Sequence, residues 1–199
     1  RSYSVTGVQT CALPIYDDCS RFQDRFLQAG YRTDAAGRCT MLTALLPFDA
    51  SHPLPGARRI AAPAGTLAAI EHSASVVDYL LACEGSTALT CADFTMQGRT
   101  AIVRQRHNAL QFYFLRQGRS FMQKDRRGFQ SPNPVTLFMQ NRHGWILSAG
   151  TEVTLYYPGI EGVRMDGSAI ATIAAGKGRC TINVPAGRHQ LEIISRHAE

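Results

Sequence analysis

The sequence predicts an all-β protein, an antiparallel β-sandwich of two stacked sheets with about 12–14 short strands. The first observation is a hairpin predicted over residues 99–117. Its two segments alternate apolar and polar residues around His107 and Asn108, a two-residue connection in which Asn tolerates a positive φ, so one face can enter a core. The second is a train of β-branched segments about ten residues apart, separated by glycine-containing turns. The third is that no helix longer than two turns is expected after residue 33.

Most segments before the hairpin have the pattern of a strand, and one is ambiguous between helix and strand. Residues 21–31 fit either helix-like spacing or an exposed strand, and extended structure is favoured. Residues 39–48 form a near-continuous apolar run ended by Pro47, which is typical of a strand buried on both faces. Residues 49–56 form a loop rich in Pro and Gly. The other strands expected here are 57–62, 66–72, 76–83, where Asp78 is the one charge, and a shorter one within 87–94.

After the hairpin, turn residues divide the chain into further strands. Residues 121–133 are expected to be a polar excursion, and Pro134 opens the next strand because Pro is tolerated at a strand's first residue. Asp166-Gly167 predicts a type I′ turn, since both central positions require a positive φ. The strands expected here are 134–140, 145–147, 151–157, 162–165, 169–173, 179–184 and 189–194.

The first residues need separate treatment. Residues 5–15 resemble one translated reading frame of a common sequencing-library adapter, so residues 1–15 are expected to be a non-native leader. A natural leader is the alternative, but Arg1 is followed by no apolar segment of a signal peptide and no small-residue cleavage site. Residues 16–199 are then expected to form one β-sandwich domain, a fragment of a larger chain.

The cysteines leave two interpretations open. Cys83 and Cys91 flank residues 84–90 and are expected either to be cross-strand neighbours joined by a disulfide or to be two small buried thiols. No CxxC pair occurs, so a zinc ribbon or a thioredoxin-like site is unsupported. Cysteine usage favours a periplasmic or secreted location. No apolar run is long enough to predict a membrane span.

The chain is basic, with 21 Lys and Arg against 15 Asp and Glu, and a formal net charge of +6. A cluster of cations could face an acidic polysaccharide or a nucleic-acid backbone. Solvated arginines that guard turns and edge strands are the favoured interpretation, so no nucleic-acid partner is predicted. The cluster comprises Arg116, Arg119, Lys124, Arg126 and Arg127.

No local motif predicts a reaction. The sequence has no G-x-S-x-G elbow and no phosphate-binding loop, and its histidines lack the close spacing of a metal site on a helix or hairpin. Only His72 and His189 lie inside predicted strands. We therefore predict no catalytic residue, no metal and no cofactor in this chain.

Two aromatic residues are candidates for substrate binding. Trp145 and Tyr157 could stack on sugar rings if their side chains are exposed. Because both lie in predicted strands, packing in the core is the favoured alternative.

Three segments resemble the C-terminal β domain of bacterial polysaccharide lyases, the heparinase II/III-like and alginate-lyase-like group. Residues 43–48 (TALLPF) resemble a T-x-L-x-P strand of that group, and residues 77–81 followed by 94–103 resemble its D-x-L-L and G-x-x-A-x-V-R stretch. Residues 163–167 and 184–191 are similar to its final hairpins. The likeness spans about 150 residues, the size of one β-sandwich domain.

The resemblance implies a parent enzyme with an upstream α-helical toroid that cleaves an acidic polysaccharide by β-elimination. The family's catalytic Tyr and His lie largely in that toroid, and its metal site, where present, uses His and Asp of the β region. No position of this sequence matches those residues, so none is carried over.

Three hypotheses about function follow. The first is a non-catalytic C-terminal β-sandwich that helps to shape the substrate cleft of a secreted or periplasmic polysaccharide lyase, with the upstream catalytic domain and an acidic polysaccharide as partners. The second is a freestanding carbohydrate-binding module, and the third is a structural or adhesive sandwich.

Overall fold

The computed structural model describes residues 55–62, 65–91, 93–124, 127–176 and 178–196. The predictions for residues 1–54, including the leader, the extended segment 21–31 and the strand 39–48, lie outside the described residues. The strands are β1 (Gly56–Ile60), β2 (Thr66–Ser73), β3 (Val76–Cys91), β4 (Phe94–Arg106), β5 (Ala109–Gln123), β6 (Arg127–Gln140), β7 (His143–Tyr156), β8 (Ile160–Met165), β9 (Ser168–Ala169), β10 (Thr172–Gly176) and β11 (Arg179–Ser195).

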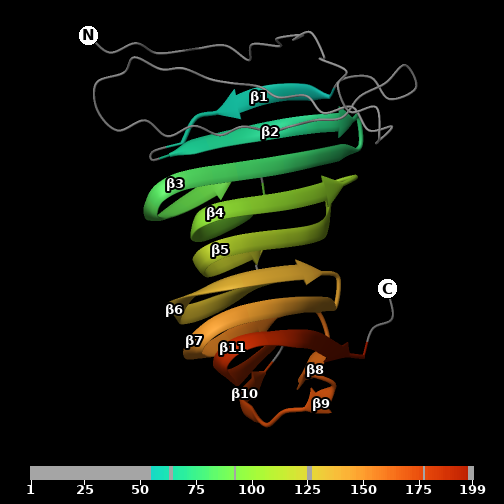
Figure 1. Cartoon of the computed structure of the whole chain (residues 1–199). Coiled ribbons are helices and arrows are strands. Elements are labelled where there is room, and N and C mark those ends of the chain that lie inside the picture. Colours follow the sequence, from blue (N-terminus) through green and yellow to red (C-terminus); the bar gives the residue numbers. More distant parts are fainter. Residues whose placement is uncertain (1–54, 63–64, 92, 125–126, 177, 197–199) are drawn as a thin grey trace, which may run out of the picture. The chain divides into compact units, whose positions relative to one another are not determined.

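The predicted all-β class is confirmed, and every strand pair is antiparallel. The strands form one hydrogen-bonded sheet in the order β1-β2-β3-β4-β5-β6-β7-β11-β8-β9, and β10 also pairs with β11 (Figure 1). Strand β11 serves as a common neighbour, because β7 runs along most of it while β10 and β8 pair with its opposite halves. The part of the chain that the structure describes holds no helix able to cross a bilayer.

This single sheet folds over to make two layers. Tyr79 pairs with Val103 and Cys91 pairs with Phe94, so nine positions of β4, or about 30 Å of straight strand, would separate the Tyr79 and Phe94 rows. The rings of Tyr79 and Phe94 nevertheless lie 5.2 Å apart, edge to face. The two halves of the long strands must therefore face each other, and Figure 1 shows β3, β4 and β5 turning back along one side of the sheet.

The turning points of neighbouring strands are aligned across the sheet in what we call the fold line. Pairing slips by one or more residues at the fold line in the β3–β4, β4–β5, β5–β6 and β6–β7 ladders, as β-bulges do when they bend a strand, whereas the β7–β11 ladder keeps its register. Gly98 and Gly118 meet there, and a Cβ on Gly118 would lie 2.8 Å from the Cβ of Leu115. The absence of a side chain at Gly98 and Gly118 therefore leaves room for β4 and β5 to approach closely at this bend. The fold line comprises residues 83–86 of β3, 98–99 of β4, 116–119 of β5, 131–135 of β6, 148–150 of β7 and 185–187 of β11.

The first layer contains β1, β2, β8, β9, the N-terminal halves of β3, β5 and β7, and the C-terminal halves of β4, β6 and β11. The second layer contains the remaining halves and β10. Alternate residues of both layers point into one shared core. Its largest fully buried side chains are Phe94, Phe121, Phe129, Leu67, Leu81, Met96, Leu115, Leu137, Met139, Ile146, Leu155 and Ile182.

A polar network joins the layers on the side away from the fold line. Asp93, between β3 and β4, accepts hydrogen bonds from Nε2 of Gln105 in the first layer at 2.5 Å and from Nε2 of Gln123 in the second at 3.0 Å. Burial by itself would raise the pKa of Asp93, but these hydrogen bonds outweigh it and the pKa is lowered. The ionised carboxylate thus links strand ends from both layers.

Within the described residues, the strands are fewer and longer than predicted, because several expected breaks are bends. The predicted strands 145–147 and 151–157 fall in β7, and 179–184 and 189–194 fall in β11. Residues 127–133, expected in the polar excursion, form the first half of β6. Glycine and proline can bend a continuous strand as well as end it. The predicted turns are present, since His107, Asn108, Asp166 and Gly167 all have positive φ.

Candidate ligand-binding surface

Aromatic side chains gather on the outer face of the first layer. Phe114 pairs across the sheet with Phe138, and Phe138 pairs with Trp145, which places these rings in one row over β5, β6 and β7. The centroid of Trp145 lies 6.1 Å from that of Phe114 and 6.4 Å from that of Phe138, and Phe112 lies 5.8 Å from Phe138. All four side chains are half-buried. We call Phe112, Phe114, Phe138 and Trp145 the aromatic surface.

An arginine lies at each end of the aromatic surface. The guanidinium of Arg104, on β4, lies 5.2 Å from the ring centroid of Phe112. The guanidinium of Arg188, on β11, lies 4.7 Å from that of Trp145. Both distances fall within the range of attractive cation–π contacts. Positive charge therefore brackets the rings.

Arg104 is held in place by Asp78. Its Nε and one terminal nitrogen donate to the two carboxylate oxygens of Asp78, each at 2.6 Å. His72 Nε2 lies 2.8 Å from Oδ2 of the same carboxylate. Burial by itself would raise the pKa of Asp78, but the hydrogen bonds from Arg104 and His72 lower it below its usual value. The one charge in the apolar run 76–83 is thus an ionised anchor for an arginine.

Arg188 differs from Arg104 in its charge partners. Among the described residues it forms no ion pair, whereas Arg104 shares its charge with Asp78. An anionic ligand would therefore meet a stronger field at the Arg188 end of the aromatic surface.

The neighbour of Arg188, His189, has a structural partner. Its Nδ1 lies 2.7 Å from Oδ2 of Asp166, and Oδ1 of Asp166 accepts the backbone N–H of Gln190 at 2.8 Å. The hydrogen bond with His189, followed by that from Gln190, lowers the pKa of Asp166. These contacts fasten the β8–β9 turn to β11, next to Arg188.

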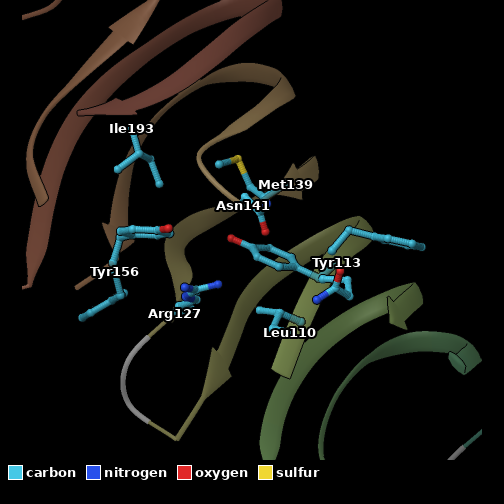
Figure 2. Close-up of a pocket in the computed structure, with 11 residues that line it drawn as sticks. Leu110, Tyr113, Arg127, Met139, Asn141, Tyr156 and Ile193 are labelled. Carbon is cyan, nitrogen blue, oxygen red and sulfur yellow. The ribbon is translucent and has the colours of Figure 1, made fainter. Parts of the chain in front are cut away.

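The small pocket in Figure 2 lies between the ends of β5, β6, β7 and β11, and Phe112 of the aromatic surface is one of its lining residues. Its volume is about 10 Å³, enough for roughly one water molecule. Figure 2 shows the Tyr113 ring pointing into it, with Leu110, Met139 and Arg127 around it. Burial raises the pKa of Tyr113, so its phenol stays protonated. A space of this size holds no sugar ring.

Of the two residues predicted to bind substrate, the structure places one on the candidate surface. Trp145 belongs to the aromatic surface. The candidate role of Tyr157 is corrected in favour of core packing. Its side chain is 4% exposed, and the Arg127 guanidinium lies 4.9 Å from its ring centroid. Its ring packs in the core and offers no face to a ligand.

Of the two alternatives left open for Cys83 and Cys91, the structure shows no disulfide between them. Both side chains are buried thiols on β3, and the Cys83 thiol donates to the carbonyl of Gly98 at 3.0 Å. The bend at the fold line lies between them, so the segment 84–90 is not the hairpin loop that would set them side by side. The alternative of two small buried thiols describes the structure.

Sequence reasoning missed Phe112, Phe114, Phe138, Arg104 and Arg188 as surface residues. The alternation in the hairpin showed that two faces exist, but each face of β5 carries aromatic residues. The pairing of β4 with β5 also shifts by one residue on passing from Arg104 to Gln105. As a result, Leu110 points inward and Phe112 points outward. One signal in the sequence could have indicated a cation such as Arg104. Asp78 lies in an apolar strand, and a buried carboxylate requires a partner.

Among the described residues, no group of three or more His, Cys, Asp or Glu side chains could hold a metal ion. Comparison with known proteins found no match, either to a family model or to a curated protein.

Proposed function

We propose that this chain is the non-catalytic β-sandwich of a secreted or periplasmic polysaccharide lyase, and that its aromatic surface forms one wall of a cleft for an acidic polysaccharide. The observation that carries the proposal is the row of half-buried rings bracketed by Arg104 and Arg188. Its partners are an upstream catalytic domain of the same chain and the glycan.

The chemistry of the surface suits an acidic sugar. Aromatic rings pack against the apolar C–H faces of sugars, and guanidinium groups form paired hydrogen bonds with carboxylates and sulfates. Because Arg188 already covers part of Trp145, a uronic acid bound here would place its carboxylate on that guanidinium. Its ring would then lie against Phe138 and Phe114.

The non-catalytic part of the proposal is supported by how the titratable side chains are used. His72 and Arg104 hold Asp78, His189 holds Asp166, and Asp93 joins the two layers. These groups are engaged in hydrogen bonds that maintain the fold.

The test is to titrate the purified full chain with alginate, heparin and uncharged dextran, and to follow binding by calorimetry. We expect the acidic glycans to bind with an affinity that falls as salt rises, and dextran to bind more weakly. Arg188→Gln should reduce binding of the acidic glycans about tenfold, the loss of roughly one charge-assisted contact. Arg59→Gln, at an exposed arginine of β1, is the matched control and should bind as the unmodified chain does.

Two outcomes would count against the proposal. Formation of unsaturated products from alginate or heparin by this chain alone would contradict the non-catalytic assignment. Equal binding of acidic glycans by Arg188→Gln and the unmodified chain would show that the glycan does not bind at the aromatic surface. Failure to bind any acidic glycan would favour a structural sandwich.

A further inference from the structure

A second candidate site lies on the outer face of the opposite layer. An open groove crosses β4, β5, β6 and β7 beside the fold line. We call it the polar groove, and its lining side chains include Gln97, Arg119, Ser120, Gln130, Ser131 and Thr154. None of these residues belongs to the aromatic surface.

The sheet register explains why polar groups line up here. Gln97 pairs with Ser120, Ser120 with Gln130, and Gln130 with Thr154, so one row runs across four neighbouring strands. Thr181 of β11 pairs with Thr154 and extends the row. Neighbouring strands lie about 4.8 Å apart, so amide and hydroxyl groups repeat at that interval.

The hydrogen bonds within the row leave several groups available. Gln130 Oε1 accepts from the Tyr156 hydroxyl at 2.8 Å, which fixes the amide and leaves its NH2 group as a donor. Among the described residues, the side chains of Gln97 and Ser120 have no hydrogen-bond partner. Arg119 donates to the carbonyl of Pro132 at 2.6 Å, and this hydrogen bond holds its side chain along the edge of the groove at the fold line.

The polar side chains and the open shape of the groove indicate which class of ligand it could bind. Hydroxyl and amide groups both donate and accept, as sugar hydroxyls do. The groove is open, unlike the enclosed pockets that bury small cofactors, and its lining side chains other than Pro132 are polar or charged. Arg119 is the one charged side chain among the lining residues, too few cations for a nucleic-acid backbone. The groove lies on a sheet face and not at an edge, so it cannot add a peptide strand.

We propose that the polar groove binds a neutral oligosaccharide in an extended conformation, with Gln97, Ser120 and the amide of Gln130 as its main hydrogen-bonding groups. The chain would then hold glycan on both outer faces, acidic sugar on the aromatic surface and uncharged sugar in the groove. The proposal does not rest on the proposed function, because the two surfaces share no residue.

The experiment maps binding on the full chain by NMR, using cellohexaose, xylohexaose and mannohexaose at millimolar concentration. We expect at least one to shift the amide signals of Gln97, Ser120 and Thr154. The Gln97→Ala/Ser120→Ala double variant should weaken that binding about tenfold, since each hydrogen bond contributes modestly. Both side chains face outward and have no hydrogen-bond partner among the residues that the structure describes, so the variant should keep the melting temperature of the unmodified chain.

Trp145→Ala is the matched control and should leave binding of the neutral hexasaccharide unchanged while it weakens binding of alginate. The proposal is overturned if none of the three sugars shifts the groove signals. It is also overturned if the shifts are confined to the residues around Trp145. Should the double variant lose stability, the single Gln97→Ala variant supplies the same comparison.

Discussion

Tyr113 and Phe121 lie eight positions apart on β5, yet their rings stack with centroids 4.3 Å apart. A straight strand would separate them by roughly 27 Å. The bend at Gln117, whose φ is 50°, and Gly118 brings them together. The same bend, repeated in neighbouring strands, makes one sheet into two packed layers.

Phe121→Ala should therefore destabilise the fold strongly. The side chain is 0% exposed and packs on both Phe94 and Tyr113, so its truncation leaves a cavity between the layers. We expect a loss of about 3–5 kcal/mol in the free energy of unfolding, measured in urea. Ile173→Ala, at a side chain that is 49% exposed, is the control and should change stability by less than about 0.5 kcal/mol. Equal losses in the two variants would contradict a core shared between layers.

Gly118→Ala should cost stability because the bend has no room for a methyl group. The added Cβ would lie 2.8 Å from Leu115 Cβ and 2.9 Å from its Cδ2. We expect a loss of about 1–3 kcal/mol, measured as a lower melting temperature and urea midpoint. Gly162→Ala is a matched control, since its Cβ would meet only Ile194 Cδ1 at 3.8 Å. An unchanged stability of Gly118→Ala would show that the fold line tolerates side chains.

Asp78 should make stability depend on pH in the acidic range. Its pKa is lowered in the folded protein, so its ionised form stabilises the fold fully above the unfolded pKa of about 3.9. That stabilisation is lost as pH falls through the lower folded pKa. Asp78→Asn should lower stability by about 2 kcal/mol at pH 7, because Arg104 loses its charged partner, and by less at pH 3.

The measurement is urea unfolding of both proteins at several pH values. Glu152→Gln, at an exposed side chain of β7, is the control for removing a carboxylate and should follow the unmodified protein. A difference between Asp78→Asn and the unmodified protein that stays constant from pH 7 to pH 3 would contradict this assignment.

Cys91 should react with iodoacetamide only after unfolding. It is 7% exposed, and burial raises the pKa of its thiol, so the reactive thiolate is scarce in the native state. Peptide mass spectrometry should find Cys91 alkylated in denaturant without reductant and unmodified under native conditions. Cys91 that remains unalkylated in denaturant until a reductant is added would instead show that it forms a disulfide.

Much of the strand pattern could be predicted from the sequence, because alternation is a local property. Ala101, Val103 and Gln105 share one side of their strand, and in the structure all three are buried. The turn at His107-Asn108 was equally local, because its positive φ values depend on the turn residues themselves.

The continuity of the strands was decided by tertiary structure. Gly150 and Gly187 look like turn residues, but each lies inside a long strand at the fold line. A local sequence cannot distinguish a bend from an end, because the difference depends on whether the next segment keeps the same neighbouring strand.

By itself, the sequence determined the all-β class, the alternation within strands and the tight turns, all of which follow from the conformational preferences of neighbouring residues. The two-layer folding of a single sheet, the burial of Tyr157 and the outward row from Phe112 to Trp145 were decided only by the tertiary structure. The physical reason is that the inner face of a strand is the one that meets the other layer. That contact joins residues far apart in the chain.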